Sequence, residues 1–137
     1  MNTVAAVGII GALYEGLRRD PSGTTVSVRA QRPLDSIDGY VVGGSGVRTL
    51  ELPAARDPLS DLVFDEATCW GSLTHWALEL PIGTHYVGAW LENQTYYFDA
   101  VDVFTDLELA WNTAVERGEM AIYDGFKQTS RSVREPS

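Results

Sequence analysis

Hydrophobic and polar residues alternate along two short segments in the last third of the chain, residues 85–91 (HYVGAWL) and 95–101 (TYYFDAV). Both segments are rich in aromatic and β-branched side chains, and turn-forming residues bound them, which is typical of β-strands. Only three residues separate the segments. We therefore expect an antiparallel hairpin whose turn centres on Asn93 and Gln94.

A turn at that position determines which residues face one another. Trp90 is expected opposite Tyr97, and Gly88 opposite Asp99. Because successive side chains point to opposite sides of a sheet, the hairpin presents two different sides. The side expected to face the core carries Val87, Ala89, Leu91, Tyr96, Phe98 and Ala100, and the other carries Tyr86, Gly88, Trp90, Tyr97, Asp99 and Val101.

A helix and a further strand are predicted after the hairpin. Thr105 and Glu108 have the spacing of a capping box at a helix N-terminus. Apolar residues then recur every three or four positions until Gly118, which suits a helix C-cap. Residues 120–123 (MAIY) are predicted to form a short strand that returns to the sheet.

The N-terminal half supplies the remaining predicted elements. The pattern predicts a helix from Asn2 or Thr3 to about Arg19, strands at 24–30, 39–42 and 47–52, and a second helix at 65–80. The glycine-rich segment 43–46 (GGSG) lacks the Lys and Ser/Thr that follow in a phosphate-binding loop, so it is predicted to be a hairpin turn.

These elements predict an α+β fold in which antiparallel β-hairpins pack with about three helices and the chain closes on the hairpin–helix–strand unit. Residues 1–126 are expected to form a single domain. Residues 127–137 are polar and show no hydrophobic period, so they are predicted to be a disordered polar tail.

Net charge limits the kinds of partner that we expect, and cysteine content indicates the redox compartment. The formal net charge of −9 argues against nucleic acid and anionic membranes, because both require clustered Lys and Arg, and it is compatible with a basic protein partner. The apolar N-terminal segment is too short to span a bilayer and is expected to be a helix packed on the core. Cys69 is the single cysteine, which suits a reducing cytosol.

Residues capable of catalysis or metal binding are few and have no recognisable spacing. His75 and His85 are the two histidines, and His75 lies six residues from Cys69 on a predicted helix, a spacing that does not place the two on one face for zinc binding. We therefore predict no metal site, no cofactor and no catalytic residue. The alternative from a different class is a small hydrolase or transferase that uses Cys69, His85 and Asp99.

The side of the hairpin that carries Tyr86, Trp90, Tyr97 and Asp99 is the candidate binding surface. One arrangement covers this side with a helix as a second core layer, since buried sheets can be apolar on both sides. The other leaves it exposed, and exposed Trp and Tyr beside a carboxylate are the anchors that protein interfaces use.

The chain resembles a family of small actinobacterial and actinobacteriophage proteins of uncharacterised function. The resemblance is carried by residues 24–42 (TTVSVRAQRPLDSIDGYVV), 86–90 (YVGAW), 95–101 (TYYFDAV) and 114–124 (AVERGEMAIYD). In that family a Gly-Gly-Trp strand precedes a Tyr-Leu-Asp-Val strand, and Ala-Ile-Phe-Asp closes the unit. Here Gly-Ala-Trp replaces Gly-Gly-Trp, and Tyr123 replaces the Phe. The resemblance implies a phage or mobile-element protein that acts inside a bacterium, and it carries over no catalytic residue.

The expected function is therefore non-enzymatic protein–protein interaction in the host bacterial cytoplasm, for example modulation of a host factor or defence system. A structural or accessory component of the virion is a second non-enzymatic alternative. The sequence leaves a homo-oligomer open.

Overall fold

The predicted hairpin forms the centre of the sheet. The computed structural model describes residues 1–46 and 48–133, and in it β7 (Tyr86–Glu92) pairs antiparallel with β8 (Thr95–Phe104). The turn residues Asn93 and Gln94 have φ angles of 50° and 66°, the left-handed conformation that a two-residue hairpin turn requires. Trp90 pairs with Tyr97 and Gly88 with Asp99, so the register predicted from the sequence is confirmed.

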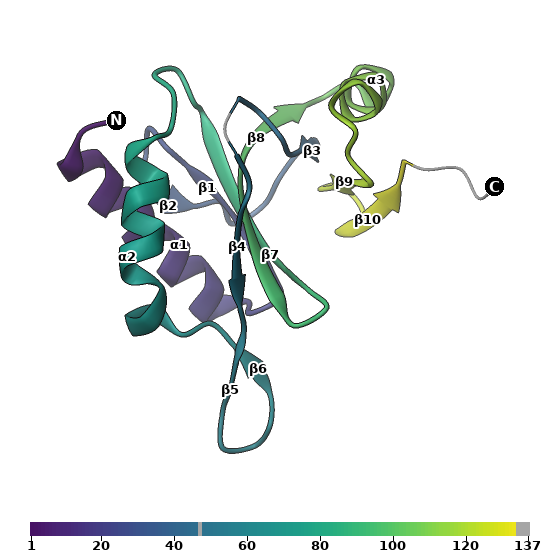
Figure 1. The fold of residues 1–137 in the computed structure, drawn as a ribbon. Helices are drawn as coiled ribbons and strands as arrows, with labels where there is room; N and C mark the ends of the chain where they lie inside the picture. Colours follow the sequence, from purple (N-terminus) through teal and green to yellow (C-terminus); the bar gives the residue numbers. More distant parts are fainter. Residues whose placement is uncertain (47, 134–137) are drawn as a thin grey trace.

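The other strands extend this hairpin on both sides (Figure 1). The strand order is β10-β9-β3-β8-β7-β1-β2, and β4 also pairs with β8. Their bounds are β1 (Gly23–Ser27), β2 (Arg32–Pro33), β3 (Tyr40–Val42), β4 (Leu50–Pro53), β9 (Ala121–Asp124) and β10 (Thr129–Ser132). All these pairings are antiparallel, and the predicted α+β class and single domain are confirmed.

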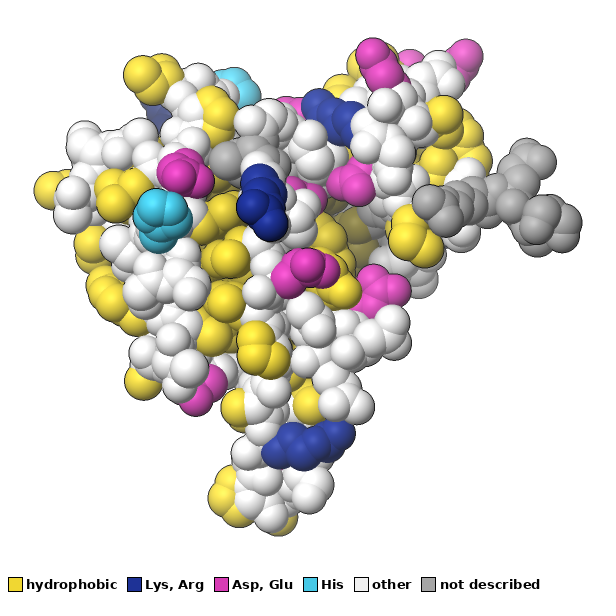
Figure 2. Space-filling model, in the orientation of Figure 1, with side chains coloured by type: hydrophobic (Ala, Val, Ile, Leu, Met, Phe, Trp, Pro, Cys, Tyr) yellow, Lys and Arg dark blue, Asp and Glu magenta, His cyan; other side chains and the backbone are white. Residues whose placement is uncertain are grey.

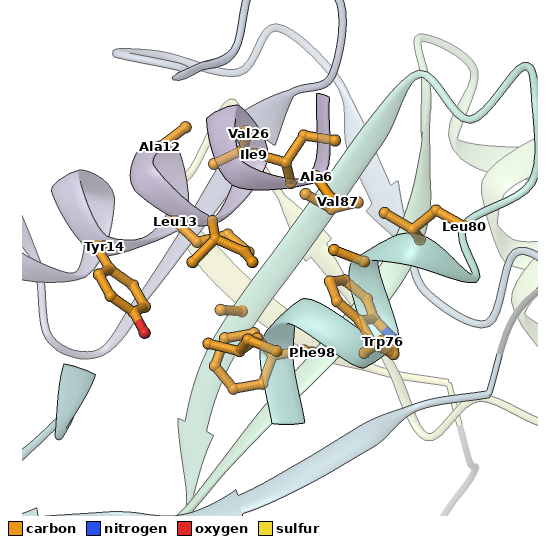
Figure 3. Packing of buried hydrophobic residues seen from close by; sticks show 14 of the residues in the cluster. Ala6, Ile9, Ala12, Leu13, Tyr14, Val26, Trp76, Leu80, Val87 and Phe98 are labelled. Carbon is orange, nitrogen blue, oxygen red and sulfur yellow. The ribbon is translucent and has the colours of Figure 1, made fainter. Parts of the chain in front are cut away.

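Two helices, α1 (Thr3–Arg19) and α2 (Glu66–Leu78), cover one side of the hairpin. Asn2 caps α1 by accepting a hydrogen bond from the backbone N–H of Ala5. Figure 3 shows Leu13, Val87 and Phe98 gathered between the two helices and the sheet. This is the side of the hairpin that the sequence predicted to face the core. None of the described helices has the length and apolar content needed to cross a membrane.

The third helix, α3 (Leu107–Arg117), packs on a second hydrophobic cluster at the far end of β8. The cluster includes Val42 on β3 and Ile122 on β9. Because β3 lies antiparallel to both β8 and β9, those two strands run parallel to each other with β3 between them, and α3 is the crossover that joins them. Gly118 ends α3 with a φ of 73°, as predicted.

The predicted capping box at the start of α3 is wrong. The N-cap is Asp106, and Thr105 precedes it. The Asp106 carboxylate accepts from the backbone N–H groups of Glu108 and Leu109. Asp and Thr are both good N-caps, so the adjacent pair offered two possible starting positions for the helix.

The predicted hairpin turn at 43–46 is also wrong. β3 and β4 do not pair with each other, because both lie antiparallel along the same edge of β8. Val42 pairs with Asp102 and Leu50 pairs with Phe98. The segment from Val42 to Leu50 is therefore eight positions long, whereas the facing segment of β8 is only four positions long. The glycine-rich segment is therefore a long bulge within one interrupted strand.

The predicted disordered tail is wrong for the residues that the structure describes. Thr129–Ser132 form β10 against β9, and Val133 is buried in the second cluster. Backbone pairing to β9 and the burial of Val133 stabilise a segment whose composition alone favoured disorder. Residues 134–137 of the predicted tail lie outside the described part of the chain.

Residues 55–63 project from the body of the domain. β5 (Ala55–Arg56) and β6 (Leu62–Val63) make a two-stranded hairpin between β4 and α2. Figures 1 and 2 show this hairpin extending away from the rest of the molecule. We call residues 55–63 the arm.

Candidate functional site

Trp90 and Tyr97 form a stacked aromatic pair on the second side of the hairpin. They are direct cross-strand neighbours on β7 and β8. Their ring centroids lie 5.9 Å apart, and the ring planes differ by 14°. Offset stacking of this kind adds about 0.5–1.5 kcal/mol to simple burial. The pair is therefore held in one geometry by both the strand register and the ring contact.

The described helices leave this pair uncovered. Tyr86, Trp90 and Tyr97 belong to neither of the two clusters that the helices form with the sheet, and all three are partly exposed. The covering helix considered from the sequence is therefore not found over these residues, and their side chains are partly exposed. We call the surface that carries Tyr86, Trp90 and Tyr97 the aromatic face.

Two carboxylates stand beside the aromatic pair on the same side of the sheet. Glu51 on β4 pairs with Tyr97, and Glu92 follows Trp90 by two positions on β7. Both glutamates are exposed. On the side of Trp90 away from Tyr97, the paired residue on β1 is Gly23, which has no side chain. One side of the indole is therefore occupied by Tyr97, and the other faces a position without a side chain.

Asp99, the fourth predicted binding residue, lies below the surface. It is 1% exposed. Its two carboxylate oxygens accept hydrogen bonds from the Gly44 backbone N–H at 3.0 Å and from the Thr49 hydroxyl at 2.9 Å. Asp99 thus holds Gly44 and Thr49 against β8 and makes no part of the surface that a partner would contact.

A second carboxylate accompanies Asp99. Asp99 Oδ2 and Glu119 Oε1 each lie 2.6 Å from the position that a Cβ on Gly43 would occupy. Burial raises the pKa of Asp99 above its ordinary value of 3.8, although the bonds from Thr49 and Gly44 and the charge of Arg117 lower it. Burial and then the charge of Asp99 raise the pKa of Glu119 above 4.5, against the opposing effect of Arg117.

Arg117 links the end of α3 to the same bulge. Its guanidinium donates to the backbone carbonyl of Gly43 at 3.1 Å and to the Asp102 carboxylate at 2.6 Å. A single cation thereby stabilises the bulge, the end of β8 and the neighbouring carboxylates. The arrangement is that of a structural ion network beneath one end of the sheet.

The structure does not bring Cys69, His85 and Asp99 together. Cys69 lies on the buried side of α2, in the core, where burial raises the pKa of its thiol. Asp99 belongs to the opposite side of β8, and His85 is exposed. His75 is paired with Glu79 at 3.3 Å. No hydrogen bond joins either histidine to Cys69 or Asp99 within the described residues.

His85 instead lines a shallow hollow of about 220 Å³ together with Ser45 and Asp102. Asp102 is occupied by the ion pair with Arg117. The described residues include no group of three or more His, Cys, Asp or Glu side chains arranged to hold a metal ion.

Sequence reasoning located the three aromatic residues but missed Glu51, Glu92 and Gly23 as their neighbours. The alternation in segment 47–52 places Glu51 on one side of a strand, yet it does not say which strand lies beside it. Comparisons of the chain with models of known protein families, with characterised proteins and with solved structures found no match.

Proposed function

We propose that this chain is a protein-binding domain that recognises a basic segment of another protein through its aromatic face. The observation that carries the proposal is the Trp90–Tyr97 stack, which lies outside both helix-covered clusters. Trp and Tyr are the side chains most enriched among the residues that dominate interface energies, because each buries a large rigid area at a small entropic cost.

The neighbours of the stack support a cationic side chain as the contact. An Arg or Lys placed over the free side of Trp90 gains a cation–π interaction of about 0.5–2 kcal/mol. Glu92 lies two residues away on the same strand, and Glu51 lies across from Tyr97. The net charge of −9 adds a long-range attraction that speeds encounter with a basic partner.

The resemblance to actinobacterial and actinobacteriophage proteins supports a setting for this activity. In our proposal the chain acts in the cytoplasm of a host bacterium and modulates a host factor or defence system by contact rather than by chemistry. The same surface would serve a component of the virion, and detection of the chain in purified particles would distinguish the two roles.

The test measures binding of fluorescently labelled peptides of equal length whose central residues are Arg, Gln or Glu, at physiological salt. We expect the Arg series to bind, and Trp90→Ala to weaken that binding about tenfold, since one aromatic anchor typically contributes more than 1 kcal/mol. Trp70→Ala is the matched control, because Trp70 is 43% exposed on α2, on the other side of the hairpin. Thermal unfolding of both variants checks that each remains folded.

Charge reversal provides a second comparison. Glu51→Lys combined with Glu92→Lys should abolish the preference for Arg peptides, whereas the double reversal of Glu108 and Glu116, both exposed on α3, should preserve it. Equal loss in the two charge-reversed proteins, or equal binding by the Trp90 and Trp70 variants, would refute recognition through the aromatic face.

A further inference from the structure

The turn between β1 and β2 carries two arginines that have no partner of their own. Residues 28–31 form the turn, Arg29 lies within it, and Arg32 begins β2 directly after it. Both side chains belong to exposed residues, and neither makes an ion pair or a hydrogen bond with a described residue. We call residues 28–32 the basic turn. It has the chemistry of the ligand proposed for the aromatic face.

Most other cations of this acidic chain are already engaged. Ion pairs with described carboxylates hold four of them, Arg18, Arg19, Arg117 and Arg131. Arg56, on the arm, donates to the Ser60 carbonyl. Arg48 and Lys127 are exposed and unpaired with described residues, but they lie on separate segments. Among the residues that the structure describes, the basic turn is therefore the one segment that gathers two free cations.

The backbone of the basic turn is held in one conformation. The Ser27 carbonyl accepts from the N–H of Gln31 at 2.8 Å, and the Ser27 hydroxyl accepts from the N–H of Ala30 at 3.1 Å. Gln31 has a φ of 53°, and its side chain lies against Gly8 of α1, where a Cβ would overlap it. This anchoring lowers the conformational entropy that the turn would lose on binding.

The basic turn and Trp90 lie at opposite ends of the sheet within one chain. Ser27, next to the turn, pairs with Tyr86, whereas Trp90 pairs with Gly23. The four positions from Tyr86 to Trp90 span about 13 Å along β7. Arg32 pairs with Ser27 and so lies two strands away from β7. An arginine side chain does not span this distance, so the turn cannot reach the aromatic face of its own chain.

We propose that the basic turn of a second copy of this chain occupies the aromatic face, so that the protein associates with itself. The inference rests on the proposed function and names a basic segment that this function requires. One arginine of the turn lies over the free side of Trp90. The other reaches Glu92, which is about 7 Å from Trp90 along β7, or Glu51 beside Tyr97. A host factor with a basic segment would then compete with the second copy for the same face.

The charges on the two surfaces are complementary, and both sets are free to pair. Glu51 and Glu92 are exposed, and neither forms an ion pair with a described residue. Asp35, the first acidic residue after the basic turn, is already paired with Arg19. The two copies each carry a net charge of −9, but at physiological ionic strength their repulsion is screened beyond about 8 Å. The closer contacts between the turn and the glutamates therefore favour association.

Sedimentation of the full chain at concentrations up to about 1 mM tests the proposal. We expect reversible self-association of the native chain. Trp90→Ala removes the face, and Arg29→Ala combined with Arg32→Ala removes the turn. Each variant alone should self-associate at least about tenfold more weakly than the native chain. An equimolar mixture of the two should form a complex, because one supplies an intact turn and the other an intact face.

Arg48→Ala combined with Lys127→Ala is the matched control, because it also removes two exposed, unpaired cations and should self-associate like the native chain. Thermal unfolding checks that every variant is folded. A native chain that is monomeric at every concentration would overturn the proposal. So would a mixture that associates no better than its components, or equal self-association by the two double variants.

The peptide assay separates this inference from the proposed function. Arg peptides that bind through Trp90 while the native chain stays monomeric would leave the proposed function intact and refute the second copy as its partner. Arg peptides that also dissociate the self-associated chain would support both. Absence of peptide binding together with absence of self-association would refute both.

Discussion

The buried carboxylate of Asp99 accepts a 3.0 Å hydrogen bond from the backbone amide of Gly44, a residue that precedes it by 55 positions. This contact, with the bond from Thr49, holds the bulge that lets β3 and β4 share one edge of β8. Asp99, which the sequence placed on the candidate binding surface, therefore has a structural role. Its substitution should lower the stability of the fold rather than weaken binding directly.

Asp99→Ala should lower the free energy of unfolding by about 1–3 kcal/mol, because it leaves the partly buried Gly44 N–H and Thr49 hydroxyl without their acceptor. Asp99→Asn should cost less, since the amide oxygen can still accept from Gly44 and the amide nitrogen can donate to Thr49. Urea unfolding of the two variants measures the difference. Equal losses of unfolding free energy in the two variants would show that Asp99 does not stabilise the chain through these hydrogen bonds.

The pH dependence of stability should carry a specific sign at Asp99. Burial raises its pKa in the folded state, so the folded chain binds a proton more readily than the unfolded chain does. The unfolding free energy contributed by this proton is fully present at pH values below the ordinary Asp pKa of 3.8. It is lost as the pH rises through the raised pKa of Asp99 in the folded chain. Glu119, whose pKa is raised from 4.5, contributes in the same direction.

The difference in unfolding free energy between the native chain and Asp99→Asn reports this contribution, together with the part of the Glu119 shift that the Asp99 charge causes, because asparagine does not titrate. Relative to the variant, the native chain should become less stable as the pH increases above about 4, and the difference should then become constant. A difference that grows in favour of the native chain over the same interval would show that the Asp99 pKa is lowered instead.

Two glycines of α1 should respond in opposite ways to alanine. A Cβ at Gly16 would overlap the side chain of Thr24 on β1, whereas a Cβ at Gly11 would meet no atom within 4 Å. Gly16→Ala should therefore destabilise the chain by about 1–3 kcal/mol through overpacking. Gly11→Ala should stabilise it by about 0.5–1 kcal/mol through helix propensity. Melting temperatures of the two variants provide the measurement.

The C-terminal strand should contribute to stability through Arg131. Its guanidinium lies 3.1 Å from the carboxylate of Asp124, which is only 1% exposed. Arg131→Ala removes the cation from a buried carboxylate and should cost about 1–3 kcal/mol, less than for a fully buried pair because Arg131 is itself partly exposed. Arg19→Ala, which breaks exposed pairs with Glu15 and Asp35, should cost no more than about 1 kcal/mol.

The same Arg131 variant tests whether residues 129–133 form part of the domain. Hydrogen exchange of the backbone amides in β10 should become faster in Arg131→Ala, while those in β7 and β8 should keep their protection. Rapid exchange of the β10 amides in the native chain would instead support the disordered tail that the composition favoured.

Local pattern determined the parts of this protein in which neighbours along the chain are neighbours in space. The Asn93–Gln94 turn set the β7–β8 register, and the polar and glycine residues Asn2 and Gly118 marked helix ends. These features depend on backbone dihedral preferences and on the two-residue and 3.6-residue periods, all of which are readable within a short window.

Only the tertiary structure decided which of the two aromatic sides of the hairpin lies free and what Asp99 does. Both depend on residues brought together from distant segments: the helices α1 and α2 on one side, and Gly44 and Thr49 beneath the other. A strand specifies the alternation of its own side chains, but the strand or helix that packs against it is chosen by the free energy of the whole fold. No local pattern records that choice.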